Sequence, residues 1–412
     1  MTAKIVIAGS GFAGFWAAIS AMRVISQANK ENSIKVILIS PRPNLTIRPR
    51  LYEAKLDNMS PDISKQLAAV GVEYIAGKIQ NIDTDAKLLT INLANGNQTS
   101  LVYERFILAT GSQLNVPPVP GFDKYGFDVD SLEAAHRLET HLQALKNKPE
   151  TLARNTVVVV GGGLTGIESA AEIPTRLKKI LGGSTKSRVF IIDSEPTVGA
   201  GMGADISPVI QQALIECGVE LRAGLRVEAL SHDGVTLSNG EDLESNTVVL
   251  ATGVKASSLT EQIRGERDAS NRIISDNYLH AQAVSNVFVA GDTVKAPTDE
   301  QGNHNLMTCQ HALSLGRVAG HNAAAELLGL PLHPYSQPKY VTCLDLGAWG
   351  ALYTEGWQRE IHYIKKEGKK IKQEINTKWI YPPELEKMSY LLSLLQIMSS
   401  FLEVKFRFNI FK

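Results

Sequence analysis

Two glycine clusters have the residue types and the spacing that hold phosphate groups. Each reads G-x-G-x-x-G between a short apolar run and a helical pattern. The glycines are Gly9, Gly11 and Gly14 after "KIVIA", and Gly161, Gly163 and Gly166 after "VVVV". In such a motif the first glycine allows a tight turn, the second lets the backbone approach a pyrophosphate, and the third lets helix and strand pack closely. The helix start adds unpaired N–H groups and partial positive charge. The sequence therefore predicts two dinucleotide sites.

The elements that must position these glycines also occur twice. A second apolar strand follows each helix, and each half then ends with a strand that runs into Ala-Thr-Gly. The second strands are 34–40 and 187–193, and the Ala-Thr-Gly ends are 105–112 and 247–254. Such self-similarity indicates two related βαβ domains rather than one large sheet. We count Thr110, Gly111 and Gly253, from these two ends, among the candidate cofactor-binding residues.

The residues at the strand ends suggest which dinucleotide each half binds. The second strand of a dinucleotide fold usually ends with an acidic residue that accepts hydrogen bonds from the adenosine ribose. That residue is Asp193 in the second half, and no Arg or Lys follows closely enough to clamp a 2′-phosphate, which favours NADH over NADPH. In the first half Ser40 is a weaker equivalent, and Arg42 is either a further contact or a solvated loop residue.

A later strand, "NVFVA", ends with Gly291 and Asp292. An Asp at that place can accept hydrogen bonds from a ribityl hydroxyl of a flavin, and the alternative is a simple turn. With these motifs the chain resembles the two-dinucleotide flavoproteins, the FAD- and NAD-dependent pyridine nucleotide oxidoreductases, over about residues 1–330. The resemblance implies an α/β fold with two Rossmann-like domains, in which an NADH domain is inserted into a split FAD domain. The expected boundaries are 1–115 and 257–330 for FAD, 116–150 for a linker, 151–256 for NADH and 331–412 for a C-terminal segment.

The cysteines narrow the reaction class. Cys217, Cys309 and Cys343 lie far apart, so no disulfide framework, zinc ribbon or redox dithiol is expected, and no metal site either. Disulfide reductases of this family carry a Cys pair that the chain lacks. Peroxide- and oxygen-reducing members carry one Cys in the segment that here is 41–54, which contains none. Electrons are therefore expected to pass from the flavin directly to an external acceptor.

Within the family the chain most resembles type II NADH dehydrogenase, a single-chain NADH:quinone oxidoreductase. The resemblance rests on "GGGLTGIESAAE", on 306–324 and on 375–383. In the family an Ala-Gln pair and a second Gln mark the quinone-side helix. Here the pair is Cys309-Gln310, and the second position is Ser314, which puts the acceptor in question. Sulfide:quinone oxidoreductase is a relative with catalytic cysteines, but the intact second glycine set argues for NADH.

Two carboxylates follow the second glycine set. Glu168 and Glu172 are four residues apart and therefore share one helix face. Glu168 is expected in the first turn, near the nicotinamide and the flavin, where it orients the hydride donor. Glu172 then relays a proton, and Gln310 lies on the acceptor side. The alternative is a helix-terminal Glu and a solvated or paired Glu. The hydride chemistry itself belongs to the cofactors.

Charge and hydropathy limit the partners. The formal net charge is zero, so nucleic acid is not expected. Residues 355–378 are basic, 385–404 read as an apolar helix, and 404–412 alternate apolar and polar residues. This end is expected to lie in a membrane interface or, alternatively, to form a dimer or core element. With no secretory signal and no run of about 18 apolar residues, we expect a protein on the cytoplasmic face of the membrane.

Two other hypotheses for the function remain open. They are a soluble oxidoreductase for a small aromatic or quinone-like metabolite, and a non-catalytic NADH sensor.

Overall fold

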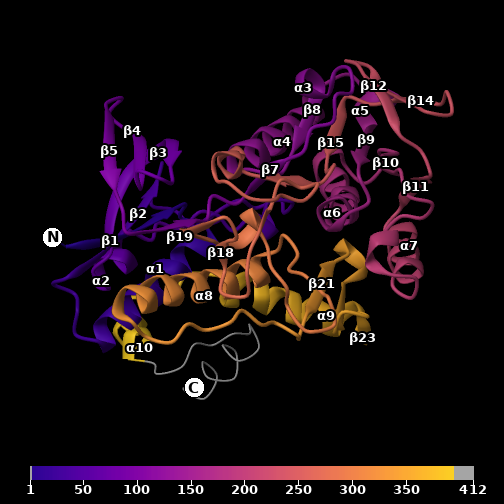
Figure 1. Cartoon of the computed structure of the whole chain (residues 1–412). Helices are drawn as coiled ribbons and strands as arrows, with labels where there is room; N and C mark the ends of the chain where they lie inside the picture. The colour runs from indigo at the N-terminus through magenta and orange to yellow at the C-terminus, as the bar shows by residue number, and fades with distance from the viewer. Residues whose placement is uncertain (1, 394–412) are drawn as a thin grey trace.

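The computed structural model describes residues 2–393. Its first layer is an eight-stranded sheet whose central strands run parallel (Figure 1). In spatial order the strands are β18 (His280–Ala281), β19 (Val284–Val289), β6 (Arg105–Leu108), β1 (Ala3–Ala8), β2 (Ile34–Ser40), β3 (Glu73–Asp83), β4 (Leu88–Leu93) and β5 (Gln98–Val102). Strands β1, β2 and β6 are apolar runs and are largely buried, as parallel strands usually are.

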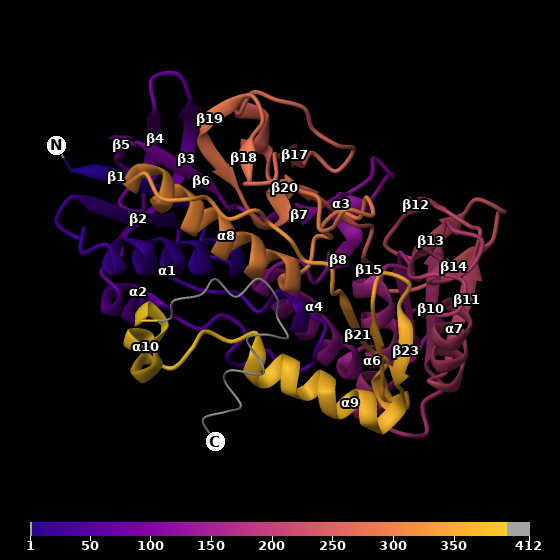
Figure 2. The same ribbon diagram turned by 60° about the horizontal axis from the view of Figure 1, so that its bottom comes forward.

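Two long helices lie side by side along this sheet (Figure 2). They are α1 (Phe12–Gln27) and α8 (Cys309–Leu328), and the short α2 (Ser64–Ala69) precedes β3. A Cβ atom on Gly316 or Gly320 of α8 would lie within 2.2 Å of a carbonyl oxygen of α1. The absence of these side chains therefore lets the two helices approach closely. Helix α8 comes from the last part of the chain, so the sheet domain is built from two separate stretches of sequence.

The second layer is a five-stranded parallel sheet at the opposite side of the molecule (Figure 1). Its strands, in spatial order, are β11 (Val219–Ala223), β10 (Arg188–Asp193), β9 (Thr156–Val160), β15 (Thr247–Leu250) and β8 (Gly126–Asp128). The helices of this region are α3 (Phe122–Tyr125), α4 (Leu132–Ala144), α5 (Leu152–Asn155), α6 (Leu164–Leu181) and α7 (Ser207–Glu216). A three-stranded antiparallel sheet of β12 (Val227–Leu230), β13 (Gly234–Leu237) and β14 (Asp242–Glu244) completes it. The stretch 116–150, expected as a linker, supplies the edge strand β8 and helix α4.

The chain crosses between the two layers twice, and the crossings pair with each other. The outgoing strand β7 (Ser112–Leu114) and the returning strand β16 (Val254–Ala256) form an antiparallel ladder. The returning chain then forms β17 (Ile273–Ile274), β18, β19 and β20 (Val294–Lys295) before α8. The predicted fold class, one Rossmann-like domain inserted into another, is therefore confirmed.

The C-terminal segment forms its own small layer (Figure 2). Strands β21 (Val341–Asp345), β22 (Ala351–Glu355) and β23 (Glu360–Tyr363) are antiparallel, and α9 (Lys365–Glu374) packs on β22. A π-helical turn at Ile375–Trp379 and α10 (Met388–Ser393) follow. Between residues 2 and 393, no helix has both the length and the apolar character that a membrane crossing requires. The predicted apolar helix from residue 394 on, and the alternating end at 404–412, lie outside the described residues.

Candidate active site

One cavity of about 1140 Å³ joins the functional motifs. Its wall includes both glycine turns, both Ala-Thr-Gly ends, the Gly291-Asp292 pair and the start of α8. Residues of β21, α9 and the following turn line it as well. Ligands of parallel α/β folds bind beyond the carboxyl ends of the strands, which is where this cavity lies.

The two glycine turns have the same geometry. A Cβ atom would lie 2.3 Å from the Ala109 carbonyl oxygen at Gly9, and 2.2 Å from the Ala251 carbonyl oxygen at Gly161. At Gly11 and Gly163, in contrast, a Cβ atom would meet nothing within 4 Å, because these positions face the cavity. Helices α1 and α6 begin there without a side-chain cap, so their first N–H groups remain available. Both turns therefore fit a pyrophosphate. The third glycines, Gly14 and Gly166, pack against the first, where a Cβ atom would lie 1.9 Å from a carbonyl oxygen.

Several residues around the first glycine turn fit a bound flavin. Asp292 lines the cavity and accepts a hydrogen bond from Ser112 Oγ at 2.6 Å, and burial raises its pKa. Arg48, which sequence reasoning missed, lies 3.6 Å from the Asp292 carboxylate and also pairs with Asp130. Thr110 lines the cavity, and its buried hydroxyl has no hydrogen-bond partner within residues 2–393. This orphaned hydroxyl is the kind of polar atom that a bound cofactor satisfies.

Besides the packing glycines Gly9 and Gly14, the predicted FAD residues Ser40 and Arg42 do not line the cavity. The Ser40 hydroxyl donates to the Arg42 carbonyl oxygen at 2.7 Å and so closes the loop after β2. The Arg42 side chain is 75% exposed and pairs with Glu133 at 3.4 Å. Glu133 does line the cavity, so Arg42 contacts a residue of the cavity wall.

The NADH side holds its expected acidic residue. Asp193 ends β10 and lies so close to Gly162 that a Cβ atom there would be 1.8 Å from its carboxylate. The backbone N–H of Glu195 donates to Asp193 at 3.2 Å, and both residues line the cavity with Gly253. Arg226 also lines this end, although it follows Asp193 by more than thirty residues, because the start of β12 folds back beside β10. The carboxylates of Asp193 and Glu195 outnumber the single cation, Arg226, and this excess of negative charge disfavours a 2′-phosphate.

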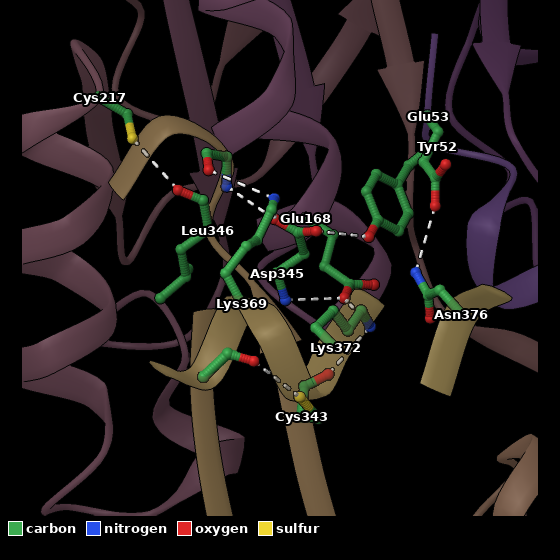
Figure 3. A network of polar contacts seen from close by, with 12 residues as sticks. Tyr52, Glu53, Glu168, Cys217, Cys343, Asp345, Leu346, Lys369, Lys372 and Asn376 are labelled. Atoms are coloured by element: carbon green, nitrogen blue, oxygen red, sulfur yellow. Dashed lines mark hydrogen bonds and ion pairs between the residues drawn. The ribbon is translucent and has the colours of Figure 1, made fainter. Parts of the chain in front are cut away.

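The structure corrects the predicted place of Glu168. Helix α6 begins at Leu164, so Glu168 lies in its second turn, and it is buried rather than exposed at a helix end. Its Oε1 atom accepts hydrogen bonds from Lys372 Nζ at 2.7 Å and from the Asp345 backbone N–H at 3.0 Å (Figure 3). Burial raises the pKa of Glu168, and Lys372 partly offsets this effect. Glu168 and Lys372 both line the cavity, so the helix face predicted from the sequence carries a buried ion pair at its wall.

The polar network continues away from the cavity. The Asp345 carboxylate accepts hydrogen bonds from Lys369 Nζ at 2.5 Å and from the Tyr52 hydroxyl at 3.1 Å (Figure 3). Glu172 is half-buried one turn after Glu168 and does not line the cavity. Burial and the nearby Asp345 raise the pKa of Glu172. Sequence reasoning missed Asp345, Lys369 and Lys372, although the spacing of the two lysines on one helix face was a signal.

The wall beyond the expected flavin position is formed by α8 and β21. Gln310 lies in the first turn of α8 and lines the cavity beside Cys309 and Cys343. Burial raises the pKa of Cys309 to about 11 and that of Cys343 to about 12, so both remain protonated thiols. Ser314, in contrast, is buried inside α8 and does not line the cavity.

The comparisons with known proteins agree with this geometry. Residues 3–316 match the family described as pyridine nucleotide-disulphide oxidoreductase. An NADH dehydrogenase-like protein of Mycobacterium tuberculosis is 43% identical over 92% of this chain and 94% of its own length. A demethylphylloquinone reductase of Synechocystis is 26% identical over 85% of this chain and 86% of its own length. The structure of NDH2 from Plasmodium falciparum in complex with NADH superposes with a TM-score of 0.77 at 14% identity, over 95% of this chain and 97% of the other.

Proposed function

Because the chain belongs to the pyridine nucleotide-disulphide oxidoreductase family and is an FAD-dependent NADH dehydrogenase, we propose that its electron acceptor is a quinone. The observation that carries the proposal is the single cavity, which runs from the NADH turn past the FAD turn to a wall of Gln310 and Lys372. A similar protein, the demethylphylloquinone reductase, acts on a quinone by its name. FAD, when bound, supplies the chemistry of accepting a hydride from NADH and passing on two electrons.

The glycine turns and strand ends hold the two cofactors in this proposal. For FAD, the helix start at Gly11 binds the pyrophosphate and Asp292 accepts a hydrogen bond from the ribityl chain. Thr110 and Gly111 complete this site, and Ser40 and Arg42 belong to the outer loop near the adenosine. For NADH, the helix start at Gly163 binds the pyrophosphate, Asp193 binds the ribose, and Gly253 lies beside the nicotinamide end.

The polar groups at the far wall position the acceptor. Lys372 is held in place by Glu168 and keeps its positive charge, because the carboxylates around it raise its pKa against the effect of burial. A fixed ammonium in a cavity stabilises negative charge that develops on a quinone oxygen. In this proposal the Gln310 amide donates a hydrogen bond to the same quinone. Glu168 orients the nicotinamide of NADH, and Glu172 relays a proton.

We also propose the domain boundaries given above, with β8 and α4 of the expected linker counted in the NADH domain. We further propose a peripheral contact with the cytoplasmic face of a membrane through the C-terminal segment. Three large apolar side chains on and after β23 are exposed, Ile361, Tyr363 and Ile364, and the cations Lys365 and Lys366 follow directly. Apolar side chains beside cations fit an anionic membrane interface. A homodimer formed by the same segment is the alternative.

A two-step stopped-flow experiment tests the proposal. Purified protein with FAD is first mixed with NADH, and the flavin absorbance band is expected to bleach within milliseconds to seconds, with NADPH as the weaker donor. The reduced protein is then mixed with ubiquinone and naphthoquinone analogues of different tail length. Rapid return of the flavin band with a quinone supports the proposal. If the band returns only with non-quinone acceptors, or with oxygen alone, the proposed acceptor is wrong.

A further inference from the structure

The loop that follows β2 belongs to both dinucleotide domains. It leaves the eight-stranded sheet after Ser40, but its apolar side chains share one hydrophobic core with residues of β9, α4 and α6. These side chains are Leu51, Leu56 and Met59, and each is at most 8% exposed. The position of the loop is therefore set by the NADH domain, although the loop starts from a strand of the FAD domain.

Arg48 lies at the point where this loop passes the cavity. Its guanidinium group pairs with Asp130, which lies between β8 and α4 of the NADH domain. The same group donates to the Ser112 hydroxyl at 2.7 Å and lies 3.6 Å from the Asp292 carboxylate. Ser112 in turn donates to Asp292 at 2.6 Å, and all four residues line the cavity. One side chain thus connects a carboxylate of the NADH domain with the carboxylate on the flavin side.

The geometry of this connection, which we call the Arg48 bridge, is well defined. The side chains of Arg48, Asp130 and Asp292 are 29%, 19% and 17% exposed, so water screens their charges only in part. The second oxygen of Asp130 accepts the Leu114 N–H of the crossing strand β7 at 2.9 Å. A guanidinium group presents its N–H donors in a rigid planar fork, which fixes the directions of two partners at once. The bridge therefore holds both carboxylates in place relative to β7.

Reduction of the flavin by NADH depends on how the two domains are placed. One hydride passes from a nicotinamide in the NADH domain to a flavin in the FAD domain, and the reaction NADH + FAD → NAD⁺ + FADH⁻ is balanced without any further reactant. The two glycine turns belong to different sheets, so contacts between the domains determine the distance between the rings. A misplacement of about 1 Å can slow such a reaction by roughly 100-fold.

We propose that Arg48 is a positioning residue for hydride transfer, because it ties Asp292 on the flavin side of the cavity to Asp130 of the NADH domain. The bridge sets the approach of the nicotinamide to the flavin and takes no part in the chemistry. This inference rests on the proposed place of FAD beside Asp292, and it does not depend on the identity of the electron acceptor.

Asp130→Asn tests the bridge at its NADH end. Asparagine keeps an oxygen for the Leu114 N–H but has no charge to hold the guanidinium group. In stopped-flow experiments without an acceptor, the limiting rate of flavin bleaching at saturating NADH should fall by roughly 10- to 100-fold. The NADH concentration that gives half of this rate should stay unchanged, because Asp193 and its glycine turn are untouched. Arg137→Gln is the matched control, since its exposed ion pair with Asp128 at 3.7 Å lies within the NADH domain, and it should behave as wild type.

Two further readouts separate positioning from flavin binding in Asp130→Asn. The dissociation constant of FAD, measured by flavin fluorescence on dilution of the holoprotein, should equal that of the wild type. The long-wavelength charge-transfer band between NAD⁺ and reduced flavin should weaken, because it reports the stacking of the two rings. A wild-type rate of flavin bleaching would overturn the inference, and so would a loss of FAD affinity as large as the loss of rate.

A double-mutant cycle tests whether the two residues act through one contact. Arg48→Gln leaves Asp130 and Asp292 without their shared cation, so both the bleaching rate and the affinity for FAD should fall. Adding Asp130→Asn to this variant should slow bleaching no further, whereas losses that multiply would refute the bridge. Asp292→Asn, assayed for FAD affinity alone, checks the place of the flavin. Weaker FAD binding supports that place, and unchanged binding would overturn it together with the inference.

Discussion

Replacing Lys372 with methionine should destabilise the protein strongly, because it leaves the Glu168 carboxylate without its cation. Glu168 is 7% exposed and its only other hydrogen bond within residues 2–393 comes from the Asp345 backbone N–H. Breaking a buried ion pair by removing one partner costs about 3–5 kcal/mol. That loss corresponds to a drop in Tm of roughly 6–20 °C for a cooperative unit of 150–250 residues.

The charge-neutral double variant separates this effect from packing. Lys372→Met with Glu168→Gln removes both charges at once, and buried pairs replaced as pairs are often close to neutral in stability. We therefore expect the double variant to regain most of the lost Tm, measured by the unfolding of the holoprotein followed by flavin release. A double variant as unstable as Lys372→Met alone would mean that the lysine stem, rather than its charge, holds α9 in place.

The pH dependence of the single variant gives a second check. Without Lys372, the largest influence that lowers the pKa of Glu168 is gone, so this pKa rises further above its unfolded value. A group with a raised folded pKa contributes stability at low pH and loses it as pH rises through the folded value. The Tm of Lys372→Met should therefore be closest to that of the wild type at acidic pH. The difference in Tm should grow as pH rises above the ordinary range of glutamate pKa values. A constant difference in Tm across this pH range would refute the reasoning.

Three further outcomes follow from the cavity wall. Gly163→Ala should fold normally but raise the KM for NADH, because its Cβ atom points into the cavity. Gly161→Ala should instead lower Tm, since its φ is +115° and its Cβ atom would meet the Ala251 carbonyl oxygen. Steady-state kinetics and thermal melts distinguish the two variants. Asp193→Asn should narrow the preference for NADH over NADPH, measured as the ratio of kcat/KM values, because it removes one of the two carboxylates at that end. Alkylation of Cys309 by iodoacetamide, followed by mass spectrometry, should stay slow at neutral pH and increase only as pH approaches about 11. Fast labelling at pH 7 would contradict the raised pKa of this thiol.

The parts of the site that could be predicted are those whose signal is local. Each glycine turn lies between one strand and the next helix, and Asp193 ends the strand that follows α6, so spacing within one strand–helix–strand unit locates them. Lys372 could not be found in this way, because it reaches Glu168 across 204 residues of sequence through the packing of α9 against β21 and β22. The predicted position of Glu168 in the first helical turn is wrong by one turn, because the third glycine of the motif, Gly166, lies inside α6 rather than before it.

The repeated Ala-Thr-Gly ends explain how two separate sheets come to share one cavity. Strand β6 runs through Thr110 and Gly111 into β7, and β15 runs through Thr252 and Gly253 into β16. The antiparallel pairing of β7 with β16 then brings the two ends together.

Hydrogen bonds across this crossing are reciprocal. The Asn115 N–H donates to the Gly253 carbonyl oxygen at 2.9 Å, and the Ser257 N–H donates to the Gly111 carbonyl oxygen at 3.0 Å. The Thr252 hydroxyl adds a bond to the Asn115 carbonyl oxygen at 2.7 Å. The carboxyl edges of both sheets are thus fixed by a short backbone ladder instead of a flexible linker. Both glycine turns therefore open into one cavity, and its remaining wall comes from α9 and β21, elsewhere in the chain.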